Sequence, residues 1–132
     1  MSAAQALQAA IYARLSEDAV LTALIGTDGV HDRLLLRRDE PHVRFAGIET
    51  RDWSTASEPG EEHIVTLEVR SGEGGHRVTQ AIAARLHALI DDAALPLSGA
   101  VLVNLRHQKT RFVRDAKARG HLAEMMFRAV TE

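Results

Sequence analysis

Seven histidines are the residues of this sequence best able to bind a metal ion, but their spacing does not favour a metal site. No two of them are four residues apart, as two ligands on one helical turn would be, and the motif His-Glu-x-x-His is absent. His76 and His87 are about three helical turns apart, which is too far for one ion. The sequence has no cysteine, so thiolate zinc ligands and thiolate nucleophiles are excluded. We therefore expect no metal and no other cofactor.

The remaining polar residues do not form a recognisable catalytic motif. Ser54 lacks the Gly-x-Ser-x-Gly sequence of a nucleophile elbow. The glycine-rich segment 72–75 precedes a helix, where phosphates can bind, but it lacks the spacing of phosphate-binding loops and its glutamate would repel phosphate. We interpret it as a turn and expect that the protein is not an enzyme. A small hydrolase is the enzyme alternative, and it would require Glu62, His63 and a third polar residue around one pocket.

The distribution of charge is the most informative chemical feature of the sequence. The formal net charge is −2, but from Val101 onward seven basic residues stand against three acidic ones, so the first hundred residues are acidic. A near-neutral chain gives no argument for nucleic acid, whereas an acidic body with a basic segment suits self-association or a charged protein partner. A solvated loop is the alternative. The candidate interface residues are the acidic Glu58, Glu61 and Glu62 and the basic Arg106, Lys109, Arg111, Arg114, Lys117 and Arg119.

Trp53 lies in a polar segment, Gly47–Glu62, that has no apolar period. We predict a long loop here, and loops beyond about 12–15 residues are often functional in a small domain. The indole is either a lid over the core or an anchor for a partner, so Trp53 joins the candidate interface. The segment Arg106–Gly120 is a second polar excursion, in which Phe112 and Val113 could form a short strand.

The elements that must position these residues are organised around a strand–turn–helix unit, His63 to Asp91. Apolar and polar residues alternate over 63–71, which is typical of a half-buried strand. After the glycine-rich turn the apolar residues recur with helical spacing, so we expect a helix laid across a short sheet. The helix face is predicted from Val78, Ala81, Ile82, Leu86, Leu89 and Ile90.

The rest of the chain predicts two helices before this unit and strands on both sides of it. Ser2–Leu15 and Asp18–Ile25 have helical spacing and capping residues, and Gly26 ends the second helix. The last segment, 121–130, fits a strand with Leu122 and Met126 or their alternates facing the core, and a helix is the alternative. The expected strands besides 63–71 are 30–36, which is weak, 42–46, 100–105 and 121–130.

The length of 132 residues predicts one domain, residues 1–132, able to bury a core without a disulfide or a metal. The N-terminal residues lack the basic and apolar regions of a secretion signal. No apolar run approaches the roughly 18 residues that suggest a membrane span. We therefore expect a soluble protein that is cytoplasmic where it is made and has no membrane partner.

The order of several short motifs resembles that of a family of phage tail-completion proteins. Residues 11–25 resemble its opening helix pair, 30–33 the strand that follows, and 52–55 its Asp-Trp motif. The sequence is also similar to the versions found in gene transfer agents, which are phage-like particles encoded by bacteria. Two local departures are Arg70, where the family tends to have an aromatic residue, and the absence of proline from 34–40. The other matching segments are 41–47, 63–71, 114–115 and 121–129.

This resemblance implies a tail terminator of the siphophage kind. Such a protein forms a ring, usually a hexamer, that caps the tail tube, ends its polymerisation and joins it to the head–neck complex. The implied partners are copies of itself, the tail tube protein and a neck or head-completion protein, with packaged DNA passing through the ring. The implied localisation is the bacterial cytoplasm during assembly and then the tail of the particle. The alternative function is a neck or head–tail connector protein.

The implied fold is α+β: a mixed, mainly antiparallel small sheet with the N-terminal helices and one central helix packed on one face. A ring repeats one contact until the rotation closes it. Opposite charge therefore suggests that the acidic segment Glu58–Glu62 of one subunit faces the basic segment Arg106–Arg119 of the next. A second hypothesis is that one of these segments, with Trp53, docks the tube or the neck.

Overall fold

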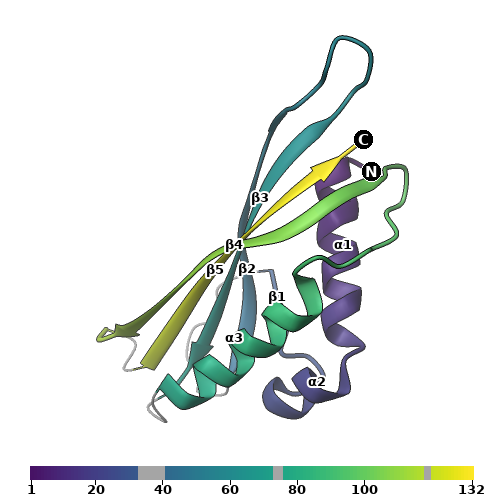
Figure 1. The fold of residues 1–132 in the computed structure, drawn as a ribbon. Helices are drawn as coiled ribbons and strands as arrows, with labels where there is room; N and C mark the ends of the chain where they lie inside the picture. Colours follow the sequence, from purple (N-terminus) through teal and green to yellow (C-terminus); the bar gives the residue numbers. More distant parts are fainter. Residues whose placement is uncertain (33–40, 73–75, 118–119) are drawn as a thin grey trace.

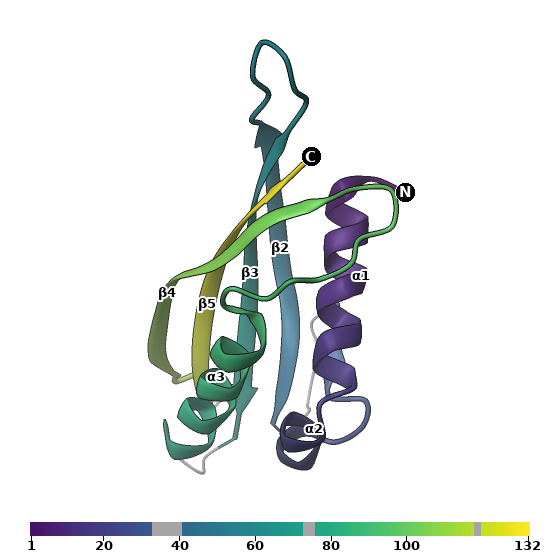
Figure 2. The ribbon, with the colours of Figure 1, turned by 45° about the vertical axis from the view of Figure 1, so that its right-hand side comes forward.

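Three helices cover one face of a five-stranded sheet in the computed structural model, which describes residues 1–32, 41–72, 76–117 and 120–132 (Figure 1). In these ranges no helix lies on the other face, as the turned view also shows (Figure 2). The α+β class predicted from the sequence is therefore confirmed. The elements are α1 (Ala3–Ser16), α2 (Ala19–Ile25), β1 (Val30–His31), β2 (His42–Asp52), β3 (Glu61–Ser71), α3 (His76–Ile90), β4 (Leu102–Asp115) and β5 (Gly120–Thr131).

The strand order is β1-β2-β3-β5-β4, so β5, the last strand of the chain, lies between β3 and β4. β1 pairs with β2 in parallel over Val30 and His31, and the other three pairings are antiparallel. This is the mixed, mainly antiparallel sheet that the resemblance implied. β3 lies at the centre, while β4 forms one edge and the short β1 lies at the other.

The helices begin where the sequence offers capping side chains. Ser2 caps α1, because its hydroxyl accepts a hydrogen bond from the Gln5 backbone and the Gln5 side chain accepts one from the Ser2 backbone. Asp18 caps α2 by accepting a 2.8 Å hydrogen bond from the Leu21 backbone. The same carboxylate accepts hydrogen bonds from Arg85 of α3 at 2.8 and 2.5 Å. Asp18 therefore joins α2 to α3, and the Arg85 hydrogen bonds lower its pKa to about 2.

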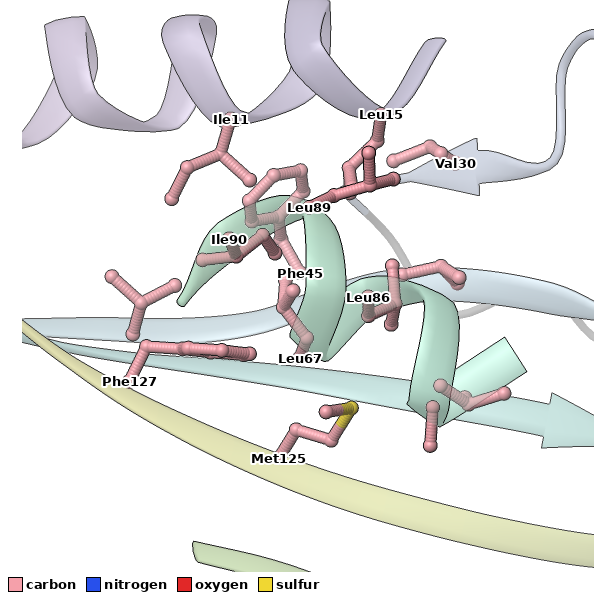
Figure 3. Close-up of a cluster of buried hydrophobic side chains, with 14 of the residues drawn as sticks. Ile11, Leu15, Val30, Phe45, Leu67, Leu86, Leu89, Ile90, Met125 and Phe127 are labelled. Atoms are coloured by element: carbon pink, nitrogen blue, oxygen red, sulfur yellow. The ribbon is translucent and has the colours of Figure 1, made fainter. Parts of the chain in front are cut away.

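The core lies between the helices and the covered face of the sheet (Figure 3). Alternate residues of each strand face the helices, so β5 places Met125 and Phe127 there, and this confirms a strand rather than a helix at 121–130. Leu122 and Met126 are on the uncovered side, so their alternates face the core. On α3 the expected face is largely correct, but Ala81 is exposed. The core includes Ile11 and Leu15 of α1, Val65, Leu67 and Val69 of β3, and Ile82, Leu86, Leu89 and Ile90 of α3.

The prediction of a long loop at Gly47–Glu62 was wrong. β2 continues to Asp52 and β3 begins at Glu61, and these two residues pair, so only residues 53–60 connect the strands. The strands carry no apolar period here because this half of the β2–β3 hairpin extends beyond the helices (Figure 1). Apart from Glu62, residues 47–62 are exposed or half-buried, so polar residues are accepted there on both faces.

The basic segment was also misread as an excursion. Most of Arg106–Gly120 continues β4, which pairs with β5 from Leu102 to Asp115. The edge position explains the error, because an edge strand with one neighbour is largely exposed and needs few apolar residues. The weak strand expected at 30–36 is reduced to Val30 and His31 in β1, and residues 33–36 lie outside the described ranges.

Both chain termini lie at the end of the molecule from which the β2–β3 hairpin projects (Figures 1 and 2). The C-terminal residue is held there by two backbone hydrogen bonds of 2.9 Å between Val101 and Glu132. This end and the exposed strand β4 contain the described candidate interface residues, which the fold therefore distributes over two surfaces.

Candidate partner interface

Trp53 follows β2 directly and stands on the protein surface. Its side chain is 46% exposed, and the guanidinium groups of Arg51 and Arg128 lie 4.7 and 5.3 Å from its ring centroid. Such cation–π contacts hold an indole in one orientation. Its backbone N–H donates a 2.9 Å hydrogen bond to the Gly60 carbonyl and closes the connection. Trp53 is therefore no lid over the core, and the anchor interpretation remains.

A shallow pocket opens beside the indole of Trp53. Its walls come from the β2–β3 connection, with Pro59, and from the β4 and β5 strands, with Val103 and Val130. Val103 is itself 49% exposed. An exposed tryptophan next to apolar side chains, with arginines packed against it, is the composition found at the centres of protein interfaces.

Glu62 is not available to a partner, contrary to its place among the candidate residues. It is 7% exposed and lies on β3 between two arginines, one from each neighbouring strand. Its two carboxylate oxygens accept 2.6 Å hydrogen bonds from Nε of Arg51 and Nε of Arg128. The Arg51 hydrogen bond and then that of Arg128 lower the pKa of Glu62. Because Glu62 lies on β3 and not in the expected loop, the neighbouring strands place both arginines beside it.

The other two acidic candidates are less engaged. Glu58 is exposed in the 53–60 connection, where its backbone, rather than its carboxylate, bonds to Thr55. Glu61 begins β3 and is half-buried. Among the described residues, neither carboxylate forms an ion pair. Both can therefore interact with a basic surface outside this chain.

The basic candidates lie along β4 rather than in a loop. Arg106 donates from Nε to Oδ1 of Asp91 at 3.1 Å, and the His107 backbone donates to the same oxygen at 2.9 Å. The His107 hydrogen bond and then that of Arg106 lower the pKa of Asp91. The remaining exposed basic residues form no ion pair with the part of the chain that is described. They are Lys109, Arg111 and Arg114 on β4 and Lys117 after it, while Arg119 lies outside the described residues.

Sequence reasoning missed the charged residues of the uncovered sheet face. Besides Arg51 and Arg128, Glu68 of β3 accepts from Arg44 of β2 at 3.0 Å and from Arg70 at 3.2 Å. Alternation over 63–71 already placed Glu68 and Arg70 on one face, and that signal could have indicated a row of paired charges there. Their partners on other strands could not be identified without the register.

Glu62 and His63 cannot form the acid–base pair that a hydrolase would need. As neighbours on a strand they point to opposite faces of the sheet. His63 is fully buried on the covered side, where it hydrogen-bonds Thr50 at 2.8 Å and Thr131 at 2.9 Å, and burial lowers its pKa. Within the described ranges, no three histidine or carboxylate side chains are grouped as a metal site would require.

Six histidines instead form ring contacts in pairs. The ring centroids of His31 of β1 and His42 of β2 are 5.9 Å apart. Those of His76 of α3 and His121 of β5 are 4.2 Å apart. Those of His87 of α3 and His107 of β4 are 4.7 Å apart. The last two contacts join α3 to β5 and to β4. These pairs are part of the packing between elements.

Comparisons with known proteins support the family resemblance. Residues 9–132 match the model of a family described as tail completion protein gp17. Among solved structures, a chain described under "virion of native gene transfer agent (GTA) particle" is 31% identical, with a TM-score of 0.90 over 99% of this chain and 98% of that chain. A second solved structure, 17% identical, has a TM-score of 0.63 over 100% of this chain and 96% of that chain, and shows the fold alone. No curated protein matches the sequence. The described helices are all too short or too polar to cross a membrane.

Proposed function

Since the chain belongs to the family of tail completion proteins, we propose that this structural protein of a phage-like tail is the tail terminator. In this role copies of the chain form a ring, a hexamer by resemblance to the family, on the end of the tail tube. The ring ends polymerisation of the tube and offers a surface to the neck or head-completion protein. Packaged DNA passes through its opening. The protein is made in the bacterial cytoplasm and becomes part of the tail.

The observation that carries this proposal is the full-length likeness to a chain of a gene transfer agent virion, with a TM-score of 0.90. The arrangement of the side chains supports it. Two groups that could take part in chemistry are already engaged: His63 is buried in packing, and Glu62 is paired with two arginines. Several exposed or half-buried groups are suited to contacts between proteins: the indole of Trp53, the basic side chains of Lys109, Arg111 and Arg114 on β4, and the carboxylates of Glu58 and Glu61.

Between neighbouring subunits of the ring we propose an electrostatic contact that uses the free charges alone. The basic side is Lys109, Arg111 and Arg114 of β4, and Glu58 and Glu61 at the projecting hairpin belong to the acidic side. Glu62 has no part in it. Reversing Arg111 and Arg114 to glutamate should reduce the proportion of rings in native mass spectrometry, and an unchanged ring mass would contradict this contact.

Trp53 and the hairpin tip serve a different contact in this proposal, with the tail tube or the neck. The tip projects from the body of the molecule, so it can reach a neighbouring component without moving the sheet (Figure 1). The indole beside Val103 and Pro59 provides an apolar anchor of the kind that contributes most to binding.

The experiment that tests the terminator function is electron microscopy of tail tubes assembled with and without this protein. We expect tubes of regulated length with a ring at one end when the protein is present, and overlong tubes without it. Tubes of the same length in both samples would contradict a terminator. If the protein then bound only particles that already had finished tubes, the connector function would replace it.

A further inference from the structure

Both edges of the sheet are open in the described part of the molecule. β4 is paired with β5 alone, and no described strand lies on its outer side from Leu102 to Asp115. At the other edge β1 pairs with Val43 and Arg44 only, so the stretch Phe45–Asp52 of β2 has no described strand on its outer side. Each edge presents backbone N–H and C=O groups that can form a ladder with a further strand.

The directions of the two edge strands suit each other. Three successive antiparallel pairings lead from β2 through β3 and β5 to β4, so β2 and β4 run in opposite directions. A rotation about an axis along the strands leaves the direction of each strand unchanged in the next copy. The β2 edge of that copy therefore meets β4 as an antiparallel neighbour, and it turns the same face of the sheet to the same side.

Opposite charges then come to the same side of such a joint. The register with β3 and β5 places Glu49 of β2 and Lys109 and Arg111 of β4 on the uncovered face. All three are exposed, and none forms an ion pair with a described residue. Cross-strand pairs of opposite charge stabilise an antiparallel ladder, whereas like charges at these places would oppose it.

Apolar surface is present on the covered side of both edges. Beside the β2 edge, Tyr12 of α1 is 48% exposed and lines a groove together with Val30 and Phe45. On β4, Phe112 is 39% exposed and pairs with Ala123, which places it on the helix side of the sheet. A joint between the two edges would shield these side chains from water and continue the apolar layer between copies.

We infer that subunits of this protein join by strand addition, with β4 of one copy pairing antiparallel to the Phe45–Asp52 stretch of β2 in the next. The register places Glu49 level with Arg106, so Glu49 faces the basic row Arg106, Lys109 and Arg111.

This inference rests on the proposed ring and changes the acidic side of its contact. The register puts Glu61 level with Leu102, so Glu49 rather than Glu58 or Glu61 meets the basic residues of β4. The joint is heterologous, because it uses two different surfaces, so an open row of copies keeps one free edge at each end until the circle closes.

Cross-linking can test the joint because the natural sequence has no cysteine. Within one copy β3 and β5 separate residue 49 from β4, so a disulfide between them can form only between copies. We would combine Glu49→Cys with Arg106→Cys, Lys109→Cys or Arg111→Cys and oxidise the proteins assembled on tail tubes. At least one combination should give a ladder of covalent multimers that ends at the number of copies in the ring. The matched control combines Arg111→Cys with Glu17→Cys, an exposed site at the end of α1, and should give no ladder.

A charge-reversal experiment gives the second readout. One variant carries Lys109→Glu and Arg111→Glu, and the other carries Glu49→Lys, so each retains one intact edge. Each variant alone should form few rings. A chain that carries all three substitutions has the charges of its two edges exchanged, so it should form rings again at least in part. Circular dichroism confirms that the variants are folded.

The outcomes separate the joint from the function. The strand joint is overturned if the wild type and both charge variants form rings and no cysteine combination gives a ladder. The proposed ring itself would then stand. In that case the basic residues of β4 only protect an edge strand from association. Absence of wild-type rings on the tubes would instead overturn the proposed function.

Discussion

The two faces of the sheet are built from the same strands but by different interactions. On the covered face, β3 and β5 place Val65, Leu67 and Phe127 against the helices, and burial of apolar surface holds them. On the other face charged residues lie in pairs, with Glu62 between Arg51 and Arg128, beside apolar side chains such as Met126. The covered face therefore determines the fold, while the uncovered face remains polar enough to stay exposed before assembly. A substitution should affect stability or assembly according to its face.

The largest loss of stability should follow Phe127→Ala. Phe127 is fully buried on the covered face, and removal of its ring leaves a cavity that the helices cannot fill. We expect the free energy of unfolding to fall by about 3–5 kcal/mol, measured by urea denaturation. The neighbouring Met126→Ala on the uncovered face is the control and should cost much less. Equal losses at 126 and 127 would show that the faces do not differ in this way.

A smaller loss should follow Glu62→Gln, which removes the charge between Arg51 and Arg128. Because these hydrogen bonds lower the pKa of Glu62, its contribution is present above its ordinary pKa of 4.5 and is lost as the pH falls through the lower folded value. The variant should unfold at lower urea concentration than the wild type at pH 7, and the difference should shrink in acid. A difference that stays constant between about pH 7 and pH 3 would contradict an electrostatic role.

Mild acid should weaken the contacts of α3 with the sheet. Burial lowers the pKa of His107 and of His121 below the ordinary value of 6.5, with His87 adding to the effect on His107 and His76 to that on His121. The unfolded chain then binds protons more readily than the folded one, so stability is lost as the pH falls below 6.5. The melting temperature should drop between about pH 7.5 and pH 5.5, and less in His121→Gln. If the melting temperature of that variant drops as much as that of the wild type, His121 does not contribute to the pH dependence.

The smallest effect on stability is expected for Trp53→Ala, because the indole is half-exposed and its contacts are with arginines. We expect a loss below about 1 kcal/mol in urea denaturation. In contrast, capping of tail tubes should be strongly reduced if the indole anchors the tube or the neck. A folded Trp53→Ala protein that caps tubes as the wild type does would contradict the anchor role.

Sequence reasoning succeeded where one face of an element is buried. The alternation of 63–71 and the helical spacing after it correctly predicted β3 and α3, because burial on one side imposes a period. It failed at 47–62 and 106–120, where the strands project or lie at an edge and no face is fully buried. The polar residues there resemble a loop. Glu62 was included in the candidate interface for the same reason, since only the register reveals that Arg51 and Arg128 neutralise it.

The placement of both termini beside the projecting hairpin has a practical consequence. Glu132 lines the pocket next to Trp53, so any residues appended to the C-terminus begin within reach of the indole. An extension of the N-terminus starts at the same end of the molecule (Figure 2). A purification tag on either terminus would therefore obstruct the surface whose binding is being assayed. Labels are better placed at Glu17, where α1 ends at the opposite pole.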